Sequence, residues 1–240
     1  MIKLAAGGSA IRAMFEEGKR LADEFGPENV FDFSIGNPYF APPDAVKDAI
    51  VDIITNDDPM TVHGYPANAG FPAVRKAVAD SLNRRFGTDY NENNIIMTVG
   101  AAGGLNVILR VLCNPGDEVI VPVPSFVCYG PLASMAGGTP VYLELKAANE
   151  FRLTPEELKS VITPRTKVLV LPFPCNPTGG TMDRTDLEAI AEVLRETNIM
   201  VVSDEIYAEL TYGRKHVSIA NIPGMYERTI VVNGFSKSHA

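Results

Sequence analysis

The chain has 240 residues, of which 46% are hydrophobic and 21% are charged, as in ordinary soluble globular proteins. Its 21 basic and 29 acidic residues give a formal net charge of −8. That balance argues against nucleic acid or an anionic membrane surface as the main partner, although a small anionic ligand would need only a local site.

The three cysteines, Cys113, Cys128 and Cys175, are widely spaced and form no Cys-x-x-Cys pair or metal-binding pattern. We therefore expect reduced structural thiols and no metal. The chain has no basic start leading into a long apolar segment, and no apolar run approaches the length of a membrane span. These observations favour a cytoplasmic protein that does not enter a membrane.

The first elements are predicted from hydrophobic spacing. Residues 9–25 carry apolar side chains at helical intervals with charged residues between them, which predicts an amphipathic helix. The prolines and glycine of residues 36–43 exclude a long regular element there. A second helix is predicted from Asp44 to Ile54.

From residue 94 onward, short β-branched runs alternate with helical or loop segments. Continuous apolar runs, as opposed to alternating ones, indicate strands covered on both faces. The pattern predicts an α/β fold with a mostly parallel sheet flanked by helices. The six expected strands are Asn94–Thr98, Glu118–Val121, Pro140–Leu145, Lys167–Leu171, Met200–Ser203 and Thr229–Val232.

Two of the connecting helices also have clear signals. Thr154 and Glu157 are spaced as a capping box, with Pro155 at the first helical position. Apolar residues between Leu187 and Leu194 form a helical stripe. Both helices fit between expected strands, as a parallel sheet requires.

Ligands of open α/β sheets bind beyond the carboxyl ends of the strands, so the residues that follow each run are the candidates for chemistry. Polar, aromatic or glycine-rich residues follow five of the six runs: 100–104, 124–126, 176–179, 204–207 and Lys237.

The turn at 100–104 and Asp204 each have two interpretations. A glycine-rich turn that opens a helix can hold a phosphate with its backbone N–H groups, although such turns also serve packing. Asp204 closes an apolar run and would need a cationic or hydrogen-bonding partner if buried. A protonated heterocyclic nitrogen is one such partner, and a helix N-cap role is the alternative.

The remaining candidates are equally open when taken singly. Tyr207 and Phe126 could contact a flat ligand or belong to the core. Asn176 is held extended by the following Pro177 and could donate to a ligand oxygen, or it could belong to an ordinary turn. Lys237 lies in a small-residue turn just beyond a buried strand, where an amine that reacts with a carbonyl would be placed.

Taken together, these residues match the requirements of pyridoxal phosphate. The cofactor needs a phosphate cradle, a stacking ring, an amide for its phenolic oxygen, a carboxylate for its ring nitrogen and a lysine for its aldehyde. Packing alone does not explain the joint occurrence of all five.

The chain resembles a class I aminotransferase, aspartate aminotransferase-like, of the fold type I pyridoxal-phosphate-dependent superfamily. The similarity runs from about Ser9 to the last residue. Its specific core is an ordered series: Asn-Pro-Thr-Gly at 176–179, Asp-Glu-Ile-Tyr at 204–207 and Ser-Lys at 236–237. Further similarity lies at Gly36-Asn37-Pro38, Tyr65–Gly70 and Pro115–Val119.

The resemblance implies catalytic roles for three residues and a cofactor role for Asn176. Lys237 would bind the cofactor aldehyde covalently and then move the proton between the substrate α-carbon and the cofactor. Asp204 would keep the ring nitrogen protonated. Tyr207 and Asn176 would hydrogen-bond the phenolic oxygen.

The remaining cofactor and substrate contacts are also implied by the resemblance. Phe126 would stack on the ring, the backbone at Gly100, Ala101 and Ala102 would hold the phosphate, and Ser236 would contribute to the same site. Tyr65 would reach the phosphate in the neighbouring subunit, so a homodimer is expected. Gly36 would lie beside the substrate carboxylate.

The resemblance further implies a domain division and two departures. Residues 1–45 would form an N-terminal arm and part of a small domain, and residues 46–240 an incomplete large cofactor-binding domain. Gly234 stands where the family often has a serine that contacts the phosphate. The chain stops at Ala240, before the family's phosphate-binding arginine and C-terminal small domain, so we expect it to be part of a longer protein.

The expected function is transfer of an amino group between an L-amino acid, aspartate-like or broad, and a 2-oxo acid. A carbon–sulfur lyase or another eliminating enzyme is an alternative, because the same electron sink serves both reactions. Two further alternatives are a cofactor-sensing regulatory domain, although the N-terminus offers no basic recognition helix, and a fragment without activity.

Overall fold

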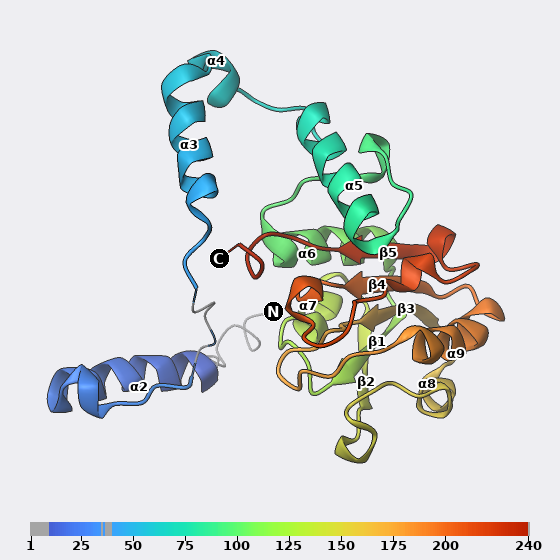
Figure 1. The fold of residues 1–240 in the computed structure, drawn as a ribbon. Helices are drawn as coiled ribbons and strands as arrows, with labels where there is room; N and C mark the ends of the chain where they lie inside the picture. Colours follow the sequence, from blue (N-terminus) through green and yellow to red (C-terminus); the bar gives the residue numbers. More distant parts are fainter. Residues whose placement is uncertain (1–9, 35, 37–39, 240) are drawn as a thin grey trace. The chain divides into compact units, whose positions relative to one another are not determined.

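The computed structural model of the chain describes residues 10–34, 36 and 40–239 (Figure 1). Within it, the chain divides between Ala41 and Pro42 into two compact units. The first unit contains helix α2 (Ala10–Phe25) and a 3-10 turn, η1 (Pro27–Asn29). The helix predicted at 9–25 is thus confirmed from Ala10, and Ser9 lies outside the described residues.

The second unit begins with a run of helices. The helix predicted from Asp44 is confirmed and extends two residues beyond Ile54. The elements of this part are α3 (Asp44–Asn56), α4 (Pro59–Val62), α5 (Pro72–Phe86), η2 (Glu92–Asn94) and α6 (Gly100–Leu112).

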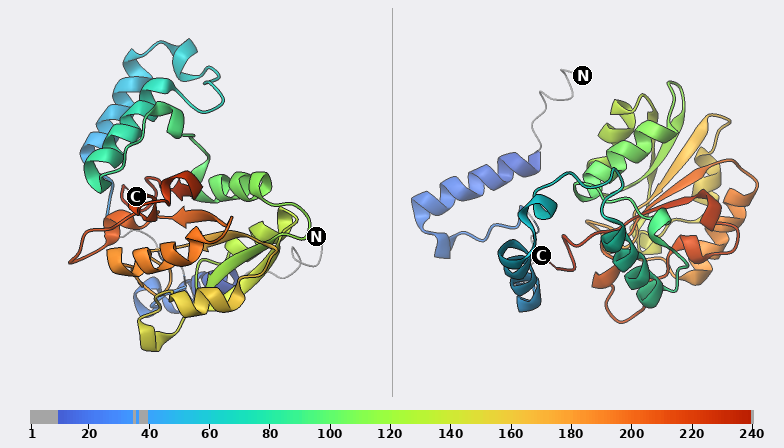
Figure 2. Two further views of the ribbon diagram at one scale, coloured as in Figure 1. Left: turned by 90° about the vertical axis from the view of Figure 1, so that its right-hand side faces the viewer. Right: turned by 90° about the horizontal axis from the view of Figure 1, so that it is seen from above.

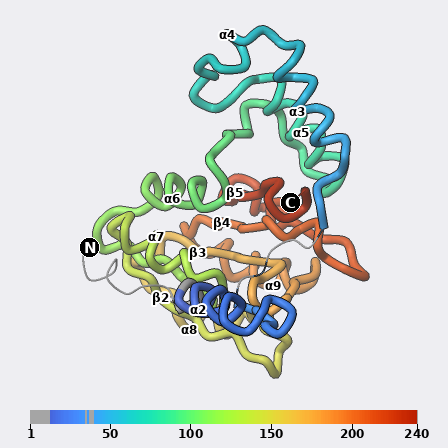
Figure 3. The backbone as a smooth tube through the Cα atoms, turned by 90° about the vertical axis from the view of Figure 1, so that its left-hand side faces the viewer, coloured from blue at the N-terminus to red at the C-terminus, as the bar shows by residue number. Residues whose placement is uncertain are grey.

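Among the described residues the second unit holds one five-stranded sheet in the order β2-β1-β3-β4-β5, and every neighbouring pair is parallel. Figure 3 shows β5, β4, β3 and β2 in this spatial order. The predicted parallel α/β sheet is therefore confirmed. The strands are β1 (Glu118–Val123), β2 (Thr139–Glu144), β3 (Thr166–Leu171), β4 (Met200–Asp204) and β5 (Thr229–Val232).

Longer helices and short 3-10 turns connect these strands. The helices are α7 (Tyr129–Met135), α8 (Pro155–Val161) and α9 (Arg184–Arg195). The 3-10 turns are η3 (Ala147–Asn149), η4 (Ala208–Leu210), η5 (Ile219–Asn221) and η6 (Tyr226–Arg228).

The sheet is buried on both faces, which explains the continuous apolar runs. Residues of α6 and α7 pack with Val202 and Val232 on one face. Residues of α8 and α9 pack with Val201 and Leu169 on the other face. Figure 2 shows the layers in two further views. Because successive strand residues point to opposite faces, Val201 and Val202 belong to different cores.

The predicted helix caps are present. The Thr154 hydroxyl accepts a hydrogen bond from the Glu157 N–H at 3.2 Å, and the Glu157 carboxylate accepts one from the Thr154 N–H at 3.1 Å. Asp183 caps α9 in the same way with Asp186. These caps fix where α8 and α9 begin.

One predicted strand is wrong. In the run Asn94–Thr98, Asn94 is the last residue of the 3-10 turn η2 and residues 95–98 are irregular. The run pairs with none of the five strands of the described sheet. Its backbone instead bonds to a loop, with Met97 N–H donating to the Ala69 carbonyl at 3.0 Å. An extended run of β-branched residues becomes a strand only when another strand accepts its hydrogen bonds.

Within the described part of the chain, none of the helices is sufficiently long and apolar to cross a membrane.

Candidate functional site

The carboxyl ends of the parallel strands bring the predicted site residues to one edge of the sheet. Strand β4 ends at Asp204, and β5 ends at Val232, which is paired with Asp204 in the ladder. The segment that carries Lys237 therefore starts beside Asp204. The loops with Phe126 and Asn176 leave the carboxyl ends of β1 and β3 at this same edge.

Asp204 is only 4% exposed and has two hydrogen-bond donors in the protein. Its Oδ2 accepts a hydrogen bond from the Tyr129 hydroxyl at 2.8 Å, and its Oδ1 accepts one from the Ile206 N–H at 3.2 Å. Burial, the largest cause, and the nearby charge of Glu205 raise the pKa of Asp204, while the two hydrogen bonds lower it by less. A cationic partner would favour the ionised form.

Tyr129 was not predicted as a site residue. It is the first residue of α7 and only 3% exposed, and burial beside Asp204 raises the pKa of its hydroxyl. The sequence does contain one indication that Tyr129 could belong to the site. Tyr129 follows Phe126 by three residues, just beyond β1. That spacing is equally typical of core packing, so it did not identify the contact with Asp204.

Asn176, Tyr207 and Lys237 come together from three loops. The Asn176 Nδ2 donates to the Tyr207 hydroxyl at 3.2 Å. The Lys237 Nζ lies 5.6 Å from the centre of the Tyr207 ring. The structure therefore brings an amide, a phenol and an amine together from three separate loops.

Phe126 is linked to Asp204 through Tyr129. The two rings meet edge to face, with their centroids 6.0 Å apart. Phe126 is 40% exposed, so part of its side chain is accessible to a ligand. An aromatic surface is thus available beside the carboxylate of Asp204.

The glycine-rich turn opens α6 as predicted. Helix α6 leads into β1 through a short loop, so the helix runs opposite to the strands and its first turn lies toward their carboxyl edge. Gly100 has a φ of +70°, and no atom would lie within 4 Å of a Cβ there. Gly100, Ala101 and Ala102 form the first turn. The Gly100 N–H donates to the Thr98 carbonyl at 3.0 Å, and the N–H groups of the first turn have no intrahelical partner.

Three of the predicted residues are not joined to this group by any described contact. Tyr65 is fully exposed in the loop before α5, and Ser236 is exposed next to Lys237. Gly36 is exposed and belongs to the first compact unit. Its neighbours in the motif, Asn37 and Pro38, lie outside the described residues.

The surroundings of residue 234 explain why a glycine stands there. A Cβ at this position would lie 3.1 Å from the Ile206 Cδ1, closer than ordinary van der Waals contact. A serine would therefore crowd the residue between Asp204 and Tyr207. The departure at 234 fits the close approach of the two loops that carry the site.

On the opposite face of β4, Glu205 forms a polar cluster that the sequence did not predict. Glu205 is 2% exposed and accepts hydrogen bonds from the hydroxyls of Ser203 at 2.9 Å and Ser218 at 2.7 Å. The His216 Nε2 lies 2.9 Å from its other oxygen. Among the described residues, no group of three or more His, Cys, Asp or Glu side chains could hold a metal ion.

Comparison with known proteins gives consistent matches. Residues 28–240 match the family model described as aminotransferase class I and II. Over 214 residues the chain is 40% identical to the putative aminotransferase YugH of Bacillus subtilis, covering 89% of this chain and 54% of that protein. Over 234 residues it is 38% identical to aspartate aminotransferase of Geobacillus stearothermophilus, covering 97% of this chain and 58% of that protein.

Solved structures give the same result. An aminotransferase from Eubacterium rectale superposes with a TM-score of 0.92 at 33% identity, covering 99% of this chain and 61% of that one. Aspartate aminotransferase from Thermus thermophilus with maleate superposes with a TM-score of 0.88 at 33% identity, covering 99% and 60%. The chain thus spans a little over half the length of the curated relatives it matches.

Proposed function

The chain belongs to the family of class I and II aminotransferases, whose members use pyridoxal phosphate, and on that premise we propose that it binds this cofactor at the carboxyl edge of its sheet. The proposed activity is transfer of an amino group between an L-amino acid, aspartate-like or broad, and a 2-oxo acid. Relatives named aspartate aminotransferase support this assignment.

The observation that carries the proposal is the state of Asp204. It is a buried carboxylate with a raised pKa, and its two protein donors leave acceptor capacity on both oxygens. A protonated pyridine nitrogen supplies the positive charge and the donor that such a group needs. The residues present therefore fit pyridoxal phosphate.

Each neighbouring group has a part that matches its chemistry. Lys237 holds the cofactor's aldehyde carbon covalently and, when released, carries the proton at the substrate α-carbon. Asn176 and Tyr207, already hydrogen-bonded to each other, bind the phenolic oxygen. The accessible part of Phe126 lies against the ring. When bound, the cofactor supplies an electron sink for the carbanion formed at the α-carbon.

The phosphate and substrate contacts extend the proposal. The first turn of α6, at Gly100, Ala101 and Ala102, holds the phosphate, because a helix N-terminus favours an anion. Ser236 contributes next to Lys237, and Gly36 lies beside the substrate carboxylate.

The domain division, assembly and location are part of the same proposal. Residues 1–45 are an arm and part of a small domain, and residues 46–240 belong to the cofactor-binding domain. The fully exposed Tyr65 reaches the phosphate of a second copy in a homodimer. The protein acts in the cytoplasm.

Covalent trapping tests the cofactor assignment without requiring turnover. The chain is mixed with pyridoxal phosphate, reduced with borohydride, digested and analysed by mass spectrometry. We expect the cofactor mass on Lys237, its loss in Lys237→Ala, and no change in the matched control Lys159→Ala on the exposed side of α8. Labelling spread over several lysines, or unchanged labelling in Lys237→Ala, would contradict the proposal.

A second assay tests the reaction. Amino acids are added one at a time, and amino-group transfer to 2-oxoglutarate is measured beside the release of pyruvate and ammonia. Transfer without release is the expected result. Release without transfer would assign an eliminating enzyme instead.

A further inference from the structure

A cavity of about 460 Å³ lies in the second unit, apart from the residues assigned to the cofactor. Its walls come from the segment before α9, the turn after η4 and the loop before α8. Residues that matter for its chemistry are Arg152, Pro174, Met182, Arg214, Lys215 and His216. Its volume is in the range of small-molecule sites in proteins.

The cavity has two positive charges that the protein does not neutralise. Arg152 is paired with Glu150 at 2.7 Å and Asp186 at 3.2 Å. Arg214, in contrast, donates only to the neutral Thr181 hydroxyl at 3.3 Å. Among the described residues, neither Arg214 nor Lys215 has a carboxylate within salt-bridge distance. Arg214 and Lys215 are therefore two cations of the lining that are available to an anionic ligand.

The one acidic side chain of the lining, Asp183, is already engaged. Its Oδ1 accepts a hydrogen bond from the Asp186 N–H at 3.0 Å, as the cap of α9. Its Oδ2 lies 3.9 Å from the Arg152 guanidinium. Arg152 therefore faces three carboxylates, those of Glu150, Asp183 and Asp186, while no carboxylate among the described residues lies within salt-bridge distance of Arg214 or Lys215.

The turn that carries the two cations is held at both ends. The Thr211 hydroxyl donates to the Ala208 carbonyl at 3.1 Å on one side, and His216 is bound to the buried Glu205 at 2.9 Å on the other. Gly213 turns the chain between them with a φ of +75°. A site whose backbone is already fixed loses little entropy when a ligand binds.

The inner wall is apolar. Met182 is 6% exposed, and Pro174 is buried. A ligand that fits this arrangement has an oxyanion at one end, for Arg214 and Lys215, and a short apolar part at the other. We propose that this cavity binds a small organic anion, a carboxylate or a phosphate ester, at a site separate from the cofactor.

Binding is tested on the whole chain loaded with pyridoxal phosphate and freed of excess cofactor. Two probes share one ring and differ in the anion: phenyl phosphate and benzoate. Benzyl alcohol is the neutral control. Backbone amide shifts of Thr181 and Gly213 are followed by NMR, so that binding elsewhere is not counted. We expect saturable shifts with at least one anion and none with benzyl alcohol.

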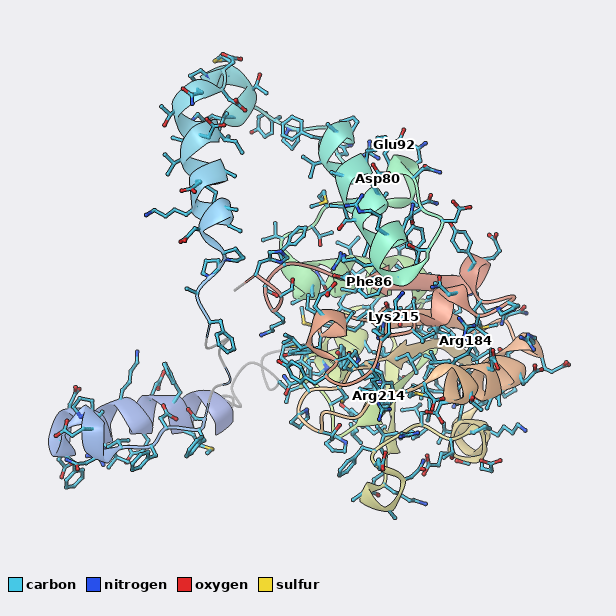
Figure 4. All side chains as sticks on the ribbon, viewed as in Figure 1. Asp80, Phe86, Glu92, Arg184, Arg214 and Lys215 are labelled. Atoms are coloured by element: carbon cyan, nitrogen blue, oxygen red, sulfur yellow. The ribbon has the colours of Figure 1, made fainter. Side chains whose placement is uncertain are left out.

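Charge removal identifies the groups responsible. The double variant Arg214→Gln/Lys215→Gln should lower the affinity for the anion at least about tenfold, because both charge-assisted contacts are lost. Figure 4 labels Arg184 together with Arg214 and Lys215, and Arg184→Gln is the matched control. Arg184 is an exposed residue of α9 that lies outside the lining and pairs with Glu188 at 3.7 Å. The control should retain binding within about twofold.

The outcomes are distinguishable. Tighter phenyl phosphate binding assigns the site to phosphate esters, and tighter benzoate binding assigns it to carboxylates. Absence of saturable shifts at Thr181 and Gly213, or equal affinity in the double variant and wild type, overturns the proposal. Thermal unfolding of each variant verifies that the fold is intact.

Discussion

Two adjacent carboxylates at the end of β4 differ in how completely the protein satisfies them. Glu205 has three side-chain partners in the protein: two serine hydroxyls donate to its Oε1, and the His216 ring lies against its Oε2. Asp204, on the opposite face, has Tyr129 and one backbone N–H. Both are at most 4% exposed. The buried carboxylate with the fewer donors is the one with room for a cationic ligand.

The largest expected effect is on Asp204. Asp204→Ala should weaken cofactor binding and slow the half-reaction with an amino donor by about a thousandfold, roughly 4 kcal/mol, because an unprotonated ring is a poor electron sink. Cofactor absorbance after a single addition of amino acid measures the rate. Asp80→Ala, which removes only an exposed pair with Lys76, is the control. A rate within a few-fold of wild type would show that another group supplies the proton.

The partner experiment is Glu205→Gln. It should lower the free energy of unfolding by about 2–4 kcal/mol, because a buried charge partner of His216 is removed and the serine hydroxyls lose a charged acceptor. Urea unfolding measures the change, and Glu188→Gln on the exposed side of α9 should stay within about 0.5 kcal/mol of wild type. An unfolding free energy equal to that of wild type would remove the contrast with Asp204.

Tyr129→Phe should have a smaller effect. The variant keeps the ring beside Phe126 and removes only the hydrogen bond to Asp204, which lowers the pKa of that carboxyl. The pKa of Asp204 should therefore rise further, and cofactor affinity should fall by about five- to tenfold at most. Fluorescence titration measures it. The control is Tyr226→Phe, whose hydroxyl makes only a 3.5 Å contact with the Asp89 carbonyl. An affinity loss as large as that of Asp204→Ala would mean that the ring itself had moved.

The smallest expected effect is a pH dependence of stability without cofactor. The pKa of Asp204 is raised from 3.8, so above that pH the folded chain binds more protons than the unfolded chain. The Asp204 contribution to stability therefore falls as the pH rises from about 4 through the folded pKa. Urea unfolding gives the free energy of unfolding of wild type and of Asp204→Asn at each pH. The difference between the two free energies should fall as the pH rises. A difference that is flat with pH would contradict the raised pKa.

Strands and strand-end residues were predictable because their signals are local. Apolar runs located β1 to β5, and the residues after them included Asp204, Asn176 and Lys237. The run at 94–98 failed because strand formation depends on a partner, which a single segment does not encode. How closely Asn176, Tyr207 and Lys237 approach one another depends on three loops and was not predictable.

The unpredicted contacts share a physical cause. Tyr129 binds a carboxylate 75 residues away, and its sequence context is that of a core aromatic. His216 and Ser218 reach Glu205 across 11 and 13 residues through a turn whose path depends on the whole sheet. Residue type and spacing in the sequence therefore do not predict that these side chains contact each other.

The 3.1 Å approach between a Cβ at Gly234 and the Ile206 Cδ1 makes these two positions interdependent. A hydroxyl-bearing side chain at 234 requires the end of the Ile206 side chain to shift by a few tenths of an ångström. Ile206→Val combined with Gly234→Ser should be better tolerated than Gly234→Ser by itself. In a large set of relatives, the two positions should covary.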